Sequence, residues 1–149
     1  MQKQKGFTII ELIVVIAIIA VLAAIVMVNV TSYIAKGKDA AIKGNMSQIS
    51  TTAAAYYESI GNYGSFASNT TANAAFYQAK SSSPASGSAV FTVSTAAAST
   101  NAAWCACANL QANSGNTTYC IDSTGYKKEG TGTGCSSRCS ASAGATCSD

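Results

Sequence analysis

The sequence contains no histidine, a single proline (Pro84), and only 10% charged residues in 149. Histidine is the commonest general base and a frequent ligand of catalytic metals, so its absence argues against most hydrolytic and metal-dependent enzymes. The formal charge of +3 falls to about +1 once Lys3 and Lys5 are set aside, which is too little for a nucleic-acid-binding face. We therefore expect no enzyme activity, no catalytic residue, no cofactor, no bound metal and no specific nucleic-acid site.

One long apolar run dominates the beginning of the chain. Every residue from 12 to 28 is apolar, and residues 7–30 include only Thr8, Glu11 and Asn29 as polar positions. A helix needs about 20 apolar residues to cross a bilayer core about 30 Å thick, and hydrocarbon requires its backbone to be hydrogen-bonded internally. The run predicts a single membrane-spanning helix, and an ordinary signal peptide or one-pass anchor is the simpler alternative.

The charges around this run distinguish between those alternatives. Lys3 and Lys5 precede it, which predicts a cytoplasmic N-terminus and places the rest of the chain outside the cytoplasm. A secretory signal has an uninterrupted apolar stretch followed by its cleavage site. Here Glu11 interrupts the start of the apolar stretch. A carboxylate inside an apolar helix costs a few kcal/mol, so Glu11 is a candidate functional residue.

Residues 5–19, KGFTIIELIVVIAII, resemble the N-terminus of the type IV pilin and pseudopilin family. In that family a membrane peptidase cleaves after the glycine and methylates the new first residue, which implies Gly6 and Phe7 as processing residues here. The acid four positions later pairs with the amine of a neighbouring subunit, which implies Glu11 and Phe7 as assembly residues. The implied partners are further copies of the chain, prepilin peptidase, inner-membrane pilus assembly machinery and membrane lipid.

The chemistry of these residues agrees with that resemblance. Cleavage after Gly6 would create an ammonium at Phe7, one helical turn from Glu11. An unpaired carboxylate is costly in a low-dielectric setting, so Glu11 needs a cation nearby. Axially staggered helices could bring the amine of one subunit to Glu11 of another and so set their register. The simpler alternative is that Glu11 lies at the level of the lipid headgroups.

The resemblance implies a structural subunit of a type IV pilus. Such a subunit is held by one transmembrane helix in the inner membrane, with its head outside the cytoplasm, and then enters a cell-surface filament used for adhesion, motility or DNA uptake. Two alternatives stay open. One is a type II secretion pseudopilin, which shares the same N-terminus, and the other is a membrane-anchored binding protein that does not polymerise.

Helical periodicity continues beyond the apolar run. Apolar residues recur at intervals of three, four or eight, and Gly61 is a suitable helix end. Gly37 and Gly44 each cost about 1 kcal/mol in a helix and could permit a bend. We predict a leader at residues 1–6, a transmembrane and filament-core helix at 7–33, an amphipathic helix half at 34–61 and a globular head at 62–149. The apolar stripe of the amphipathic half consists of Ile34, Ile42, Met46, Ile49, Ala53, Tyr56 or Tyr57, and Ile60.

The head alternates between turn-rich and strand-like segments. Residues 62–87 predict a surface loop held by scattered aromatic side chains, and residues 113–116 predict a hairpin turn. Strands are expected at residues 89–93, 102–110, 117–122 and 126–128. A long helix followed by an antiparallel meander predicts an α+β fold, in which the amphipathic half of the helix packs on a small sheet.

All six cysteines lie in the last third of the chain. An even number of cysteines in a domain outside the cytoplasm predicts disulfides, which would order a tail that has few other apolar residues. We favour Cys105 with Cys120 and leave three tail cysteines as candidates for Cys107, and we expect no Cys105–Cys107 bond. A zinc site, or a calcium site at Asp122 and Glu129, is a weaker alternative. The cysteines are Cys105, Cys107, Cys120, Cys135, Cys139 and Cys147.

Overall fold

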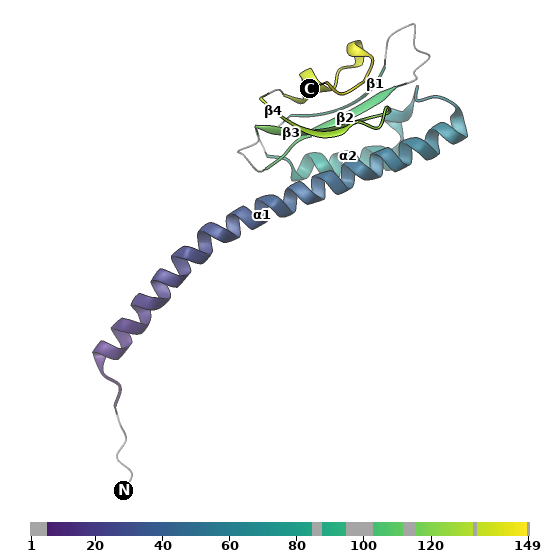
Figure 1. The fold of residues 1–149 in the computed structure, drawn as a ribbon. Coiled ribbons are helices and arrows are strands. Elements are labelled where there is room, and N and C mark those ends of the chain that lie inside the picture. The colour runs from purple at the N-terminus through teal and green to yellow at the C-terminus, as the bar shows by residue number, and fades with distance from the viewer. Residues whose placement is uncertain (1–5, 85–87, 95–102, 112–115, 133, 149) are drawn as a thin grey trace. The chain divides into compact units, whose positions relative to one another are not determined.

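The computed structural model describes residues 6–84, 88–94, 103–111, 116–132 and 134–148 (Figure 1). It divides the chain into an N-terminal unit, Met1–Ile34, and a C-terminal unit, Ala35–Asp149. A long helix, α1 (Ile9–Ile60), contributes residues to both units. The remaining helices and a four-stranded antiparallel sheet belong to the C-terminal unit, so the predicted α+β class is confirmed.

Helix α1 is continuous over its 52 residues, including Gly37 and Gly44. It begins two residues after Phe7, where the sequence pattern placed its start. It ends before Gly61, as predicted, because Gly61 has a φ of +78° that favours glycine. The N–H of Gly61 donates to the carbonyl oxygen of Tyr57 at 2.7 Å, which satisfies one of the last carbonyls of the helix.

The sheet is an antiparallel meander in the order β1-β2-β3-β4. Its strands are β1 (Ala89–Val93), β2 (Trp104–Asn109), β3 (Thr117–Asp122) and β4 (Lys127–Thr131). The predicted limits of β1 and β3 are confirmed, whereas β2 is shorter than predicted at both ends and β4 begins later and extends further. The predicted hairpin turn at residues 113–116 lies almost entirely outside the described residues.

The prediction of a surface loop at residues 62–87 is wrong. This segment contains a 3-10 helix, η1 (Phe66–Ser68), and an α-helix, α2 (Thr70–Ser82). Asn69 caps α2, because its side-chain oxygen accepts a hydrogen bond from the N–H of Ala72 at 3.0 Å. The buried residues of α2 follow a helical spacing that the small side chains concealed: Ala72, Ala75, Phe76 and Ala79.

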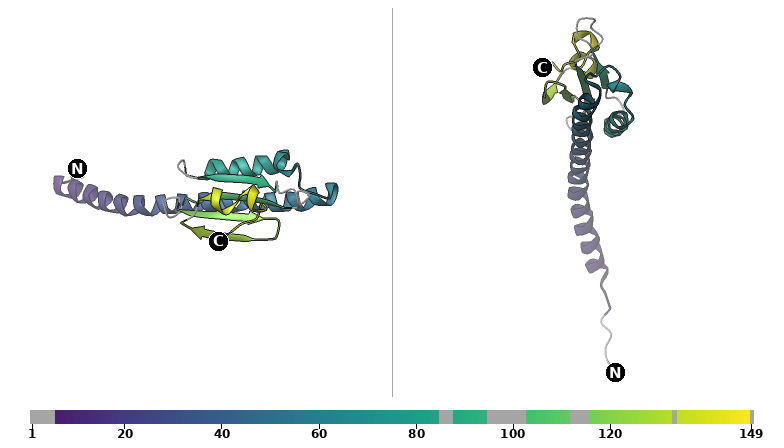
Figure 2. Two further views of the ribbon diagram at one scale, coloured as in Figure 1. Left: turned by 90° about the horizontal axis from the view of Figure 1, so that it is seen from above. Right: turned by 90° about the vertical axis from the view of Figure 1, so that its right-hand side faces the viewer.

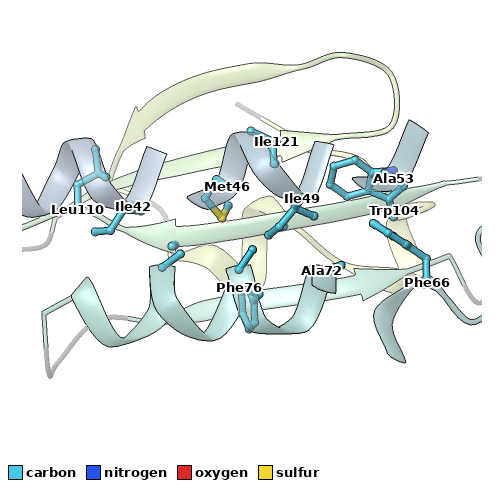
Figure 3. Packing of buried hydrophobic residues seen from close by; sticks show 14 residues of the cluster. Ile42, Met46, Ile49, Ala53, Phe66, Ala72, Phe76, Trp104, Leu110 and Ile121 are labelled. Carbon is cyan, nitrogen blue, oxygen red and sulfur yellow. The ribbon is translucent and has the colours of Figure 1, made fainter. Parts of the chain in front are cut away.

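Helices α1 and α2 cover one face of the sheet in the C-terminal unit (Figures 1 and 2). Figure 3 shows Ile42, Met46 and Ile49 of α1 directed into the same layer as Phe76 of α2. Phe66 lies in the aromatic part of this core, with its ring centre 5.5 Å from those of both Phe91 and Trp104. The middle of the predicted amphipathic stripe, from Ile42 to Ala53, therefore packs in this core, whereas Ile34 and Ile60 at its ends are exposed. Burial of the core side chains is the main favourable term for this unit.

The C-terminal tail covers the opposite face of the sheet. It contains two short helices, α3 (Cys135–Arg138) and η3 (Ala141–Ala143). Alternate residues of β2 point to opposite faces, so Trp104 contacts the helices while Cys105 contacts the tail. Every residue of β2 is buried because both faces of this strand are covered.

Three disulfides join the tail to the sheet: Cys105–Cys139, Cys107–Cys135 and Cys120–Cys147. The predicted use of all six cysteines in disulfides is confirmed, and Cys135 was among the candidates for Cys107. The favoured Cys105–Cys120 pairing is wrong. In the sheet, Cys105 lies opposite Asp122 and Cys107 lies opposite Cys120. Cys105 and Cys120 are therefore diagonal neighbours, which are about 7–8 Å apart in an antiparallel pair and too far for a disulfide.

A buried arginine also holds the tail in place. Arg138 donates from Nη1 to Thr118 Oγ1 at 2.9 Å, from Nη2 to Tyr126 Oη at 3.0 Å, and from Nε to the carbonyl oxygen of Ser148 at 2.9 Å. Its guanidinium lies directly over Gly130 in β4, where an added Cβ would come within 2.5 Å of Arg138 Cζ. Glycine at this position therefore allows the tail to approach the sheet closely.

Candidate assembly site at the N-terminus

The predicted processing residues lie just before α1. Gly6, Phe7 and Thr8 are outside the helix, and the side chain of Phe7 is 82% exposed. Exposed, non-helical chain is the usual substrate conformation for proteolytic cleavage. The peptide bond between Gly6 and Phe7 is therefore placed where an enzyme could reach it.

Glu11 lies in the first turn of α1 and is hydrogen-bonded to Thr8. Oε2 of Glu11 accepts from the N–H of Thr8 at 2.9 Å and from Thr8 Oγ1 at 2.8 Å. In return, the N–H of Glu11 donates to Thr8 Oγ1 at 3.3 Å. This reciprocal pattern is a capping box, in which Thr8 is the N-cap and Glu11 is the third helical residue.

This capping box was not predicted from the sequence, because Glu11 was interpreted through its charge and not through its spacing from Thr8. The signal in the sequence is the threonine three residues before the glutamate, ahead of an apolar run. In the single chain, the Glu11 carboxylate accepts from the Thr8 N–H and hydroxyl through Oε2, so a second donor can approach Oε1. A negative charge here is also favourable because the N-terminal turn of a helix carries partial positive charge.

The apolar side chains that follow Glu11 are exposed. From Ile9 to Ile34 the exposed fractions of those large apolar side chains that the structure describes lie between 45% at Val30 and 78% at Ile9. By length and composition, α1 is suited to cross a membrane, and its most apolar window buries nothing inside the protein. Such a surface requires lipid or other apolar helices around it, because water solvates it poorly.

The residues proposed as weaker metal ligands are engaged in other bonds. Asp122 Oδ1 accepts from the N–H of Thr124 at 2.8 Å, and Oδ2 accepts from the N–H of Cys147 at 2.7 Å. Glu129 forms an ion pair with Lys43. Within the described parts of the chain, no three His, Cys, Asp or Glu residues are grouped as a metal site would require.

Comparison with protein families matches residues 1–27 to the prokaryotic N-terminal methylation motif. The resemblance of this segment to a type IV pilin-like prepilin motif is thereby confirmed. Together, the motif and the apolar helix support a type IV pilin-like protein or a pseudopilin. The chain matches no curated protein and no solved structure.

Proposed function

We propose that this chain is the structural subunit of a type IV pilus. The subunit is made with a leader at residues 1–6 and is held in the inner membrane by residues 7–33. Cleavage after Gly6 and methylation of Phe7 produce the mature form, which polymerises through its apolar helix. The observation that carries the proposal is that the methylation motif coincides with a long apolar helix, in whose first half the described large apolar side chains are exposed.

A force other than hydrophobic burial has to bring these helices together. Lipid tails are as apolar as the helix surface, so transfer from the membrane into a filament gains little from the hydrophobic effect. Side-chain packing and polar interactions must therefore supply most of the free energy that favours the filament over the membrane. Glu11 is the one ionisable group in the apolar part of α1, so it is the residue best placed to make the filament preferable to the membrane.

The amine created by cleavage is the natural partner of Glu11. In the free chain the Glu11 carboxylate is already bonded to Thr8 through Oε2, and Oε1 can accept a further donor. The ammonium on Phe7 of a neighbouring subunit would supply a charge-assisted hydrogen bond, which is stronger than a neutral one. Since this pair forms at one axial offset only, it also sets the register between subunits.

The location and partners follow from this assembly route. Before assembly, residues 34–61 and the head at residues 62–149 lie outside the cytoplasm, and membrane lipid surrounds the apolar helix. Prepilin peptidase and the inner-membrane pilus machinery act on the subunit there. After assembly the chain contacts other copies of itself in a filament on the cell surface, which serves adhesion, motility or DNA uptake.

Substitution of Glu11→Gln tests the assembly role, with Glu58→Gln as the matched control on the same helix. Glu58 is exposed in the second half of α1. Electron microscopy should show at least about tenfold fewer filaments for Glu11→Gln, since one partner of a desolvated charge pair is lost. Glu58→Gln should leave the filament count unchanged. Mass spectrometry should find both proteins beginning at a methylated Phe7.

Two results would contradict the proposal in different ways. Normal filaments from Glu11→Gln would exclude the charge pair as the basis of assembly while leaving the processing intact. A mature wild-type chain that retains Met1, or that is cut after the apolar run, would exclude the processing itself. The chain would then be an anchored or secreted protein that does not enter a pilus.

A further inference from the structure

Asn29 carries hydrogen-bonding groups that α1 leaves unused. Between residues 9 and 30 of the chain, Glu11 and Asn29 are the only polar side chains. The Nδ2 atom of Asn29 donates to the carbonyl oxygen of Ile25 at 3.2 Å, and the side chain is exposed. An asparagine amide has two N–H donors and one carbonyl acceptor. Among the described residues, its second N–H and its carbonyl oxygen therefore have no partner, and an apolar environment makes such groups costly.

Glu11 and Asn29 lie on the same face of α1. The helix is continuous between them, and their separation of 18 residues corresponds to about five turns and a rise of about 27 Å. The rest of this segment is apolar on all sides, so its periodicity alone selects no face. The two polar side chains do select one, and the apolar residues between them on this face follow the four-three spacing of a coiled-coil seam: Val15, Ile18, Leu22 and Ile25.

Two apolar grooves flank this seam and have Leu22 in common. One groove is also lined by Ile18 and Val21, and the other by Ile19 and Val26. In a helix, Ile18 and Val21 lie on one side of Leu22 around the axis, and Ile19 and Val26 lie on the other. Leu22 is therefore a ridge between two grooves, a surface that a second apolar helix fits by ridge-into-groove packing. The partner that we infer is another copy of α1, since the proposed filament consists of such copies.

The charge pair between Phe7 and Glu11 fixes how two such copies are displaced along the helix axis. Phe7 of one copy lies level with Glu11 of its neighbour, so the two parallel chains are offset by four residues, which is about 6 Å. The same offset brings Asn29 of the first copy level with Tyr33 of the neighbour. Tyr33 is 71% exposed, and a separation of four residues places it on the same helix face as Asn29. One register therefore aligns both polar pairs.

We propose that the Asn29 amide of one subunit hydrogen-bonds to the Tyr33 hydroxyl of its neighbour in the filament. This contact rests on the proposed function, and it lies at the opposite end of the seam from Glu11. Packed helices lie about 8–10 Å apart, a distance that a tyrosine and an asparagine side chain span together. The amide and the hydroxyl each donate and accept, so either supplies the donor. An asparagine at one seam position fixes the register of packed helices, because other registers leave its amide without a partner.

Two variants remove the contact with little change in size or hydropathy. Tyr33→Phe deletes only the hydroxyl, and Tyr57→Phe, at another exposed tyrosine of α1, is its control. The exchange of Asn29→Val and Val30→Asn in one chain keeps the composition and turns the amide by about 100° around the helix, away from the seam. Electron microscopy should show about threefold to tenfold fewer filaments for Tyr33→Phe and for the exchange, as expected for the loss of one interhelical hydrogen bond. Tyr57→Phe should leave the filament count unchanged.

A combined variant separates one shared hydrogen bond from two independent effects. With Tyr33→Phe and the exchange in one chain, the filament count should be no lower than in the worse of the two variants. Mass spectrometry should find every variant beginning at a methylated Phe7. A wild type that forms no filaments would exclude the proposed function itself. Undiminished filaments in Tyr33→Phe or in the exchange, or multiplied losses in the combined variant, would exclude the contact alone, as expected if both side chains meet only lipid headgroups or water.

Discussion

The two halves of α1 have the same backbone conformation and opposite side-chain environments. Ile18, in the N-terminal unit, is 54% exposed, whereas Ile49, in the C-terminal unit, is fully buried. The first half is apolar on all sides, so within its own chain it cannot bury more than a fraction of that surface. The second half has one apolar stripe, which packs on the sheet. The half of α1 that is more hydrophobic is therefore the half whose side chains are less covered by the rest of the chain.

This difference separates two sources of stability. The N-terminal unit has helical hydrogen bonds and the capping box between Thr8 and Glu11, and the large apolar side chains described in it are exposed. The C-terminal unit has its own core on one face of the sheet and a disulfide-bonded tail on the other. Substitutions of the same kind should therefore have unequal effects in the two units.

Truncation of a buried isoleucine should have the largest effect on folding. Ile49→Ala removes methylene and methyl groups from the core and should lower the free energy of unfolding by about 2–5 kcal/mol. Ile18→Ala should change it by less than about 0.5 kcal/mol in the unassembled chain, because Ile18 is 54% exposed and does not belong to the core of the C-terminal unit. Urea unfolding in detergent, followed by Trp104 fluorescence, reports on the C-terminal unit. Equal losses from the two substitutions would contradict the contrast drawn between the two halves of α1.

Loss of one disulfide should come next. The double substitution Cys107→Ala and Cys135→Ala opens a bond that spans 28 residues in sequence and should cost the C-terminal unit about 2–4 kcal/mol. The exposed neighbour Ser136→Ala is the control and should have no measurable effect. The same fluorescence measurement applies, and unchanged stability would show that the tail is held without this cross-link.

A smaller loss is expected where the tail approaches the sheet. Gly130→Ala places a methyl group against the Arg138 guanidinium and should cost about 1–3 kcal/mol through displacement of that side chain. Gly134→Ala is the control, because the nearest atom to its added Cβ would be Ser88 Oγ at 3.7 Å, an ordinary contact distance. Thermal unfolding of both variants would test the close approach, and equal melting temperatures would count against it.

Substitution of one glycine inside α1 and of the glycine that follows it should have the smallest effects, with opposite signs. Gly44→Ala has open space around the new methyl group and should stabilise the helix by about 1 kcal/mol. Gly61→Ala should destabilise the chain by about 1 kcal/mol, because its φ of +78° is unfavourable for alanine. Urea unfolding of the two single variants measures both changes. Stabilisation by Gly61→Ala would show that the helix end does not need this conformation.

Much of the fold was predictable because its signals are local. The length and periodicity of α1, its end at Gly61, and the limits of β1 and β3 follow from residues close together in sequence. Helix α2 was missed although Asn69 and the spacing of its buried residues were visible. Its stripe consists mostly of alanine, whose small apolar surface contrasts weakly with the serine and threonine around it.

Individual residues likewise divide into those with a local signal in the sequence and those without one. Gly6, Phe7 and Glu11 could be selected from the motif, which lies within the matched residues 1–27, and their roles stay predictions. The hydrogen bonds between Thr8 and Glu11 are local, so the sequence contained their signal as well. The surroundings of Trp104 had no such signal, because the rings of Tyr63, Phe66 and Phe91 reach it from segments that are far apart in sequence.

The sequence alone determined the membrane-type helix, the methylation motif and the use of the cysteines in disulfides, since these depend on composition and on short-range spacing. The tertiary structure decided which cysteines pair and what surrounds Trp104. Cysteine pairing depends on the register between β2 and β3, which places Cys107 opposite Cys120, and on the path of the tail across the sheet. Strand register and the path of the tail both depend on contacts between residues far apart in sequence. Several registers and several cysteine pairings have similar local energies, and only the packing of the whole core selects among them.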